Sequence, residues 1–178
     1  YIDFKSPETF RASACLARGS GICVSKAALL AAAARASGIP ARVGFADVRN
    51  HLTTPRLRQL MGTDLFVYHG YAELYLDGKW VKATPAFDSG LCEKFGVRPL
   101  EFDGREDSLF HPHDVNGRRH MEYVRDRGSA VDVPVADILD GHPEITELRE
   151  QVFGRVEDRL HGRSALLRAR AAALQFRR

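Results

Sequence analysis

The chain contains 178 residues, of which 44% are hydrophobic and 28% are charged, and its formal net charge is +3. This length allows one domain with a proper core, and this composition is typical of a soluble globular protein. The small positive charge does not by itself indicate nucleic acid binding, and no apolar run approaches the roughly 20 residues that cross a bilayer, so we expect neither nucleic acid nor a membrane as a partner.

The cysteine content favours a reducing compartment. Three cysteines cannot all pair within one chain, and Cys15, Cys23 and Cys92 lack the close spacing of a structural zinc site. We therefore expect a cytoplasmic protein with free thiols. The chain begins at Tyr1 rather than Met, which leaves room for a preceding N-terminal portion, a signal peptide included.

The first part of the chain predicts two helices. A short helix is expected over residues 6–18, with Ser6 as its N-cap, and the Gly-Ser-Gly run at 19–21 ends it. The strongest helical signal covers residues 23–37 and stops at Gly38. The residues of this helix that we expect to face the core are Leu29, Leu30, Ala33 and Ala34.

The middle of the chain predicts strands. The expected elements are a strand over 41–48, a short helix over 54–61, a strand over 65–76 and a returning strand over 79–83. Asp77-Gly78 is a strong hairpin turn signal. Pro85 ends the returning strand, because proline cannot donate to a ladder. The last two strands are thus expected to form a hairpin.

The signal is weaker beyond residue 89. We expect, in order, strands over 100–103 and 121–125, a linker-like stretch from 132 to 143, and one or two helices over 144–176. The chain is therefore divided into a core domain over residues 1–132 and a helical C-terminal extension over 133–178. The extension is basic but lacks interleaved aromatic residues, so we expect its helices to be solvated or to join copies of the chain in a homo-oligomer.

Cys23 and His69 form the leading candidate for a catalytic pair. Cys23 opens the 23–37 helix directly after a glycine-containing turn. The unpaired N–H groups and partial positive charge of a helix start favour the thiolate, which is the reactive form of cysteine. His69 lies on the predicted 65–76 strand, and its ordinary pKa suits a general base. The backbone N–H of Cys23 is a natural donor to an oxyanion.

These motifs carry a family resemblance. Gly21-Ile22-Cys23 heads a helix that ends in Gly38–Val43, and His69 is followed by Glu73 and then by the Gly78-Lys79-Trp80-Val81 hairpin. In this combination the region from Leu16 to Pro85 resembles the core of the transglutaminase-like superfamily. The resemblance implies an α+β fold of papain-like architecture, in which the cysteine-bearing helix packs on an antiparallel sheet. It also implies a Cys-His-Asp triad with Cys23 as nucleophile and His69 as base.

The third triad position departs from the family pattern. Where the family usually has Asp-Pro, this chain has Thr84-Pro85. A threonine hydroxyl can accept a hydrogen bond from imidazole, but it offers no negative charge to stabilise imidazolium. Asp88 is therefore an alternative partner for His69, although it would equally suit the cap of a turn. Tyr71 stands where the family usually has Trp, and we expect it to keep the packing role.

Other histidines offer weaker alternatives. His51 leaves the strand that follows the cysteine helix and is the main rival to His69 as base, but a loop histidine is positioned less firmly than a strand histidine. His111, His113 and His120 invite a metal site, yet no further ligand is placed convincingly and exposed loop histidines are the favoured interpretation. We expect neither a metal nor an organic cofactor.

The sequence therefore predicts cysteine-dependent acyl chemistry on a peptide or protein amide. Hydrolysis is favoured over acyl transfer to an amine, because simple bacterial-looking relatives of this superfamily are often proteases or amidases. Transglutaminase-type transfer to amines remains the alternative within enzymes. A non-catalytic protein-binding module that keeps the fold is the alternative from another class, and Thr84 in place of the acid favours it.

Overall fold

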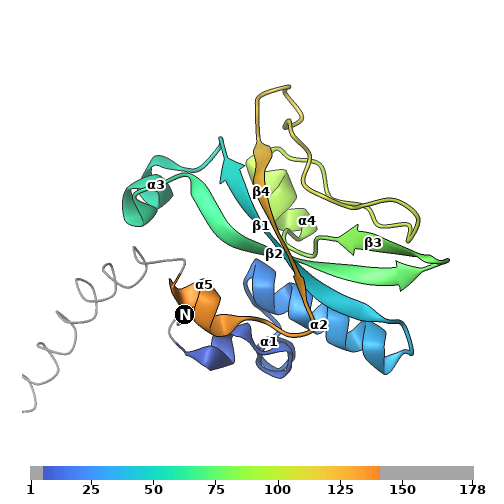
Figure 1. Cartoon of the computed structure of the whole chain (residues 1–178). Coiled ribbons are helices and arrows are strands. Elements are labelled where there is room, and N and C mark those ends of the chain that lie inside the picture. The colour runs from blue at the N-terminus through green and yellow to red at the C-terminus, as the bar shows by residue number, and fades with distance from the viewer. Residues whose placement is uncertain (1–5, 141–178) are drawn as a thin grey trace, which may run out of the picture. The chain divides into compact units, whose positions relative to one another are not determined.

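The computed structural model describes residues 6–140, apart from the side chain of Leu60, and these residues form an α+β fold (Figure 1). The helices expected over 144–176 lie outside the described residues. In chain order the elements are η1 (Pro7–Phe10), α1 (Ala12–Arg18), α2 (Cys23–Ala36), β1 (Ala41–Asn50), α3 (Pro55–Met61), β2 (Leu65–Leu76), β3 (Lys79–Ala83), α4 (Ser89–Phe95), β4 (Met121–Ala130) and α5 (Val135–Asp140).

The four strands form one antiparallel sheet in the order β3-β2-β1-β4. β2 and β3 are joined by a tight hairpin, in which Asp77 and Gly78 take φ values of 47° and 83°, as a two-residue turn of this kind requires. β3 is short and pairs with β2 only over residues 72–76. On the β3 side, therefore, the edge of β2 is unpaired beside residues 65–71 in this sheet.

Several elements agree closely with the sequence predictions. α2 begins at Cys23 as expected, and β2 and β3 have the predicted bounds. Thr54 caps α3 by accepting a hydrogen bond from the Leu57 amide, and Gly62 follows the helix at φ 68°. β1 and β4 begin where expected and run further than predicted, because they pair with each other across the sheet.

Other predictions are wrong in detail. The first helix is divided at Arg11 into η1 and α1, and Ser6 makes no side-chain cap bond. Residues 100–103 form no strand, α4 is an additional helix, and α5 forms inside the expected linker. α4 and α5 have only 7 and 6 residues and would not persist alone in water. They are held by burying Cys92 and Ile138, which local sequence patterns do not reveal.

The core-facing side of α2 also differs from the predicted one. The buried residues of α2 are Val24, Ser25, Ala27, Ala31 and Ala34. Of the predicted positions, Ala34 is buried and Ala33 is exposed, while both leucines are only partly buried. The helix is apolar on nearly every side, so periodicity alone could not select the buried face. The small side chains that do face the sheet allow a close approach of helix and strands.

The two faces of the sheet are covered differently. α2 lies against one face (Figure 1), and the cluster there contains Phe10, Val24, Ala27, Ala31, Val43, Phe45, Ala72 and Ile138. The opposite face carries a second cluster made of Ala46, Val48, Tyr71, Phe110 and Met121. Tyr71 and Ala72 fall in different clusters because successive strand residues point to opposite faces.

Within residues 6–140, no helix on its own is both long and apolar enough to cross a membrane. α1 and α2 meet the length and composition criteria only as a pair, and that pair is bent by 102°.

Candidate active site

Cys23 occupies the first position of α2, where helix amides lack partners within the helix. Ile22 is the N-cap, its side chain makes no capping bond, and the first turn contains no acidic residue. The first N–H groups are thus free of side-chain caps and direct partial positive charge toward Cys23. Gly21 is required just before, because a Cβ there would lie 2.5 Å from Ser25 Oγ and 2.6 Å from Cys15 Sγ.

The start of α2 meets β2 at the unpaired edge of that strand. A Cβ on Gly70 would lie 2.7 Å from Val24 Cα and 3.1 Å from Val24 N, so only glycine lets the strand and helix approach this closely. At this contact the Gly70 amide donates a hydrogen bond to the Cys23 sulfur. Because β3 ends at Ala83, the sheet offers no strand that would compete for this amide. The sulfur thus lies beside the residue that follows His69.

A third segment, residues 84–87, contacts the start of α2. Lys26, one turn after Cys23, donates a 2.8 Å hydrogen bond to the carbonyl oxygen of Ala86. Thr84 is buried directly after β3. Three of the four predicted site residues, Cys23, His69 and Thr84, therefore come from segments that meet at one corner of the sheet.

Burial, rather than the helix start, dominates the pKa of the Cys23 thiol. The protein packed around the sulfur raises this pKa above its ordinary value, even though Cys23 keeps part of its surface exposed. The amides of Gly70, Val24 and Cys23 and the charge of Lys26 lower the pKa by less. The expectation that the helix start holds Cys23 ionised is therefore wrong for the resting protein, because a buried thiolate loses more solvation than these groups restore.

His69 is buried on the face of the sheet away from α2. The centroid of its ring lies 4.7 Å from that of Phe110 and 6.4 Å from that of Tyr123. Burial among these aromatic rings lowers the pKa of His69 to about 4, since a protonated imidazole would lose its hydration there. At neutral pH the ring is consequently uncharged and able to accept a proton.

The triad-like arrangement lacks an acid in the part of the chain that the structure describes. His69 Nε2 is buried without a hydrogen-bond partner, whereas the buried Thr84 hydroxyl lies beside the phenol oxygen of Tyr123. Asp88 is exposed and caps α4, where its Oδ1 accepts a 2.8 Å hydrogen bond from the Leu91 amide. Of the two roles considered for Asp88, the geometry therefore accounts for capping. An imidazole nitrogen thus remains buried without a hydrogen-bond partner, which costs free energy.

Tyr71 replaces the family's tryptophan and packs as expected. Its side chain is fully buried, and its ring lies on Gly44 of the neighbouring strand, where a Cβ would come within 2.1 Å of the ring. Lys82 Nζ lies 4.9 Å from the centroid of the same ring. Tyr71 thus fills the space beside His69 on the same face of the sheet.

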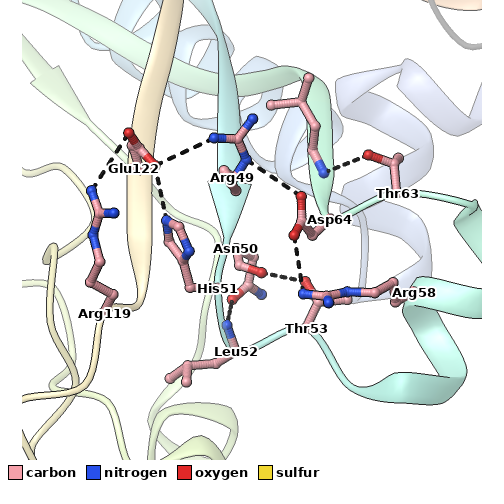
Figure 2. Close-up of polar contacts among 11 residues, drawn as sticks. Arg49, Asn50, His51, Leu52, Thr53, Arg58, Thr63, Asp64, Arg119 and Glu122 are labelled. Atoms are coloured by element: carbon pink, nitrogen blue, oxygen red, sulfur yellow. Dashed lines mark hydrogen bonds and ion pairs between the residues drawn. The ribbon is translucent and has the colours of Figure 1, made fainter.

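His51 belongs to a separate polar network at the far end of β1 (Figure 2). Its Nε2 donates a 2.9 Å hydrogen bond to Glu122, and this bond is the main cause of the lowered pKa of Glu122. Arg49 and Arg119 also pair with Glu122. Gly70 lies opposite Phe45 in the β1–β2 ladder, and His51 is six residues further along the chain, about 20 Å in an extended strand. His51 is therefore poorly placed to act on Cys23.

The loop histidines do not form a metal site. Among residues 6–140, no three His, Cys, Asp or Glu side chains are arranged to hold a metal ion. His113 is exposed as predicted, whereas His120 is buried at 4% exposure and its Nδ1 has no hydrogen-bond partner. The prediction of exposed loop histidines is thus wrong for His120, which packs beside Phe87 with 6.3 Å between ring centroids.

The sequence did not single out Gly70 or Lys26, although both build the corner around Cys23. A glycine inside a strand of large residues is a recognised sign of close backbone approach, and this signal could have identified Gly70. Lys26 lies in a helix whose other positions are mostly apolar, but nothing in the sequence links it to residue 86.

Comparison with protein families supports the resemblance of this chain to the transglutaminase-like superfamily. Residues 1–85 match the model of the transglutaminase-like superfamily, and these residues include Cys23, His69 and Thr84. The superfamily is usually enzymatic, and its chemistry is in general cysteine-dependent acyl chemistry. Comparison with curated proteins and with solved structures gives no match.

Proposed function

Because residues 1–85 match the model of the transglutaminase-like superfamily, we propose that this protein performs cysteine-dependent acyl chemistry on peptide or protein amides. Cys23 is the nucleophile and His69 is the general base, within a papain-like arrangement of helix and sheet. The observation that carries the proposal is the hydrogen bond from the Gly70 amide to the Cys23 sulfur, at the uncapped start of α2 and one residue after His69.

The proposed reaction begins from a neutral pair. Burial raises the pKa of Cys23 and lowers that of His69, so both groups are neutral at rest. The proposal requires the imidazole, buried on the other face of β2, to reach the sulfur at the Gly70 edge of this strand as substrate binds. The proton then moves from sulfur to imidazole as the sulfur attacks the carbonyl carbon. A carbon–sulfur bond forms, and the negative charge on the carbonyl oxygen is stabilised by the Cys23 amide and the free N–H groups of the first turn.

Collapse of this intermediate breaks the carbon–nitrogen bond. The leaving amine takes the proton from His69, and a thioester remains on Cys23. Water then gives a proton to His69 as its oxygen attacks the thioester, and breakage of the carbon–sulfur bond returns that proton to sulfur. Amide and water are thus converted to acid and amine, and the thiol is regenerated.

Thr84 takes the place of the missing acid in this scheme. Its hydroxyl and the His69 ring both border Tyr123, so the hydroxyl would have to turn from Tyr123 to the imidazole once the imidazole becomes charged. A hydroxyl supplies orientation without negative charge, so we expect slower chemistry than an Asp-containing site would give.

Hydrolysis and acyl transfer are separated by one experiment. A glutamine-containing peptide is incubated with the protein and a labelled amine, and both ammonia release and label incorporation are measured. Release of ammonia without incorporated label indicates hydrolysis, which we favour, while incorporation indicates transfer. Cys23→Ser should abolish both, and Cys92→Ser, which removes a buried thiol outside the proposed site, should preserve both.

A non-catalytic binding module is the second candidate. The raised pKa of Cys23 and the absence of a carboxylate partner for His69 among residues 6–140 favour it. An activated ester distinguishes the two functions, because it needs no specific substrate pocket. If folded protein acquires no acyl group on Cys23 faster than on an ordinary exposed thiol, the enzyme proposal fails and the binding module is preferred.

A further inference from the structure

The residue that precedes His69 is held in a strained conformation. Tyr68 has a φ of 53°, in the left-handed region that a bulky side chain normally avoids. In a regular strand, residues two apart point to the same face. Side chains alternate regularly from Tyr68 to Ala72, and His69, opposite Ala46, is the last β2 residue paired in register before the shift between Ala46 and Val48. The conformation of Tyr68 therefore sets where the regular segment of β2 that carries His69 begins.

Asp47 provides the hydrogen bond that accommodates this conformation. It lies on β1 where the pairing with β2 shifts register, between Ala46 and Val48. Asp47 Oδ1 accepts a 3.2 Å hydrogen bond from the Tyr68 amide, a donor that a regular ladder would pair with a backbone carbonyl. Only 5% of Asp47 is exposed, so its charge needs a partner within the protein.

Arg127 of β4 is that partner and also touches Tyr68. Its Nε and Nη2 donate to the two carboxylate oxygens of Asp47 at 2.5 and 2.9 Å, a bidentate pair with fixed geometry. The Arg127 guanidinium carbon lies 4.2 Å from the centroid of the Tyr68 ring. This pair, which we call the Asp47–Arg127 clamp, thus ties three strands together at the strained residue.

We propose that the Asp47–Arg127 clamp positions the imidazole of His69 by holding Tyr68 in its left-handed conformation. Both residues act through Tyr68 and are positioning residues rather than catalytic ones. A buried ion pair usually adds little to the free energy of unfolding compared with well-packed apolar residues. We therefore explain this ion pair by the backbone conformation of Tyr68 that it holds. The contribution of the clamp to catalysis rests on the proposed function. Its effect on the placement of the His69 imidazole does not.

NMR titration of His69 in the folded, full-length protein tests the proposal without any substrate. Asp47→Asn and Arg127→Gln each loosen the clamp, which should let the imidazole leave its buried position against Phe110. The pKa of His69 should then rise from about 4 toward 6.5, by about one pH unit or more. Arg125→Gln, at an exposed position of the same strand, is the matched control and should titrate like the wild type.

A second set of variants separates positioning from general stability. Glycine adopts positive φ without penalty, so Asp47→Asn combined with Tyr68→Gly should return the pKa of His69 toward about 4. Arg127→Lys keeps the charge but loses the bidentate geometry. If Asp47→Asn or Arg127→Gln does not fold, Arg127→Lys is measured in its place. An unchanged pKa of His69 in the folded clamp variants, or an equal rise with and without Tyr68→Gly, overturns the proposal. Absence of Cys23 acylation in the wild type would instead overturn the proposed function and leave this titration result standing.

Discussion

The buried, neutral imidazole of His69 predicts a specific loss of stability in acid. In the unfolded chain this group binds a proton as the pH falls through 6.5, whereas in the folded protein it does so only near pH 4. The folded state therefore loses stability relative to the unfolded state as the pH falls from about 6.5 to 4. The difference of 6.5 − 4 = 2.5 in pKa, at about 1.4 kcal/mol for each pH unit, amounts to about 3 kcal/mol.

Urea unfolding followed by circular dichroism between pH 4 and 8 measures this effect. His69→Gln removes the titrating group, so the advantage of the wild type over this variant should shrink by about 3 kcal/mol across the range. Groups that titrate in both proteins cancel in the comparison. His113→Gln, at an exposed position, is the control for the loss of a histidine that is not buried. If the gap between wild type and His69→Gln stays constant from pH 8 to 4, the imidazole is not buried as a neutral base and the reasoning fails.

Three further variants examine the corner around Cys23. Gly70→Ala places a Cβ 2.7 Å from Val24 Cα, so we expect a loss of about 1–3 kcal/mol in the free energy of unfolding and slower acylation of Cys23. Thr84→Asp puts a carboxylate at the position proposed to orient His69 and should raise the pKa of His69 in an NMR titration, because the new charge favours imidazolium. Asp88→Ala removes the cap of α4, so it should cost about 1 kcal/mol and leave the acylation rate unchanged.

Each of these variants has an outcome that would count against the structure-based interpretation. Gly90→Ala is the control for Gly70→Ala, since its Cβ would meet only Asp88 Oδ1 at an ordinary 3.4 Å. If the two changes have equal effects, the close contact between β2 and α2 at Gly70 does not determine the stability or the acylation rate. An unmoved His69 titration in Thr84→Asp would mean that residue 84 does not face the imidazole. Loss of acylation in Asp88→Ala, without unfolding, would restore Asp88 as the partner of His69.

The elements that carry the site were predictable because their signals are local. Gly38 and Thr54 mark helix ends, and Asp77-Gly78 marks the hairpin, through conformational preferences that act over a few residues. The start of α2 at Cys23 follows from the same kind of signal. In contrast, α4 and α5 depend on tertiary burial, and residues 100–103 pack as loop against the second face of the sheet through Leu100. Such contacts have no local signature.

The electrostatics of the site were not predictable for a related reason. A helix start lowers a thiol pKa wherever it occurs, but the opposing effect of burial depends on how closely β2 approaches α2 at Gly70. The clamp on Tyr68 likewise joins Asp47 to Arg127, which are 80 residues apart in the chain. The pairing of β1 with β4, with its register shifts on both sides of Asp47, brings these residues together.

The most direct test of the proposed chemistry is the rate at which an activated ester acylates Cys23 at pH 7.5 in the wild type and in His69→Gln. Mass mapping of the labelled peptide distinguishes Cys23 from the buried Cys15 and Cys92. Because general base catalysis contributes roughly 10²–10⁴-fold, acylation of Cys23 should be at least about 100-fold slower in the folded variant. Equal acylation rates in the two folded proteins would contradict a Cys23–His69 pair.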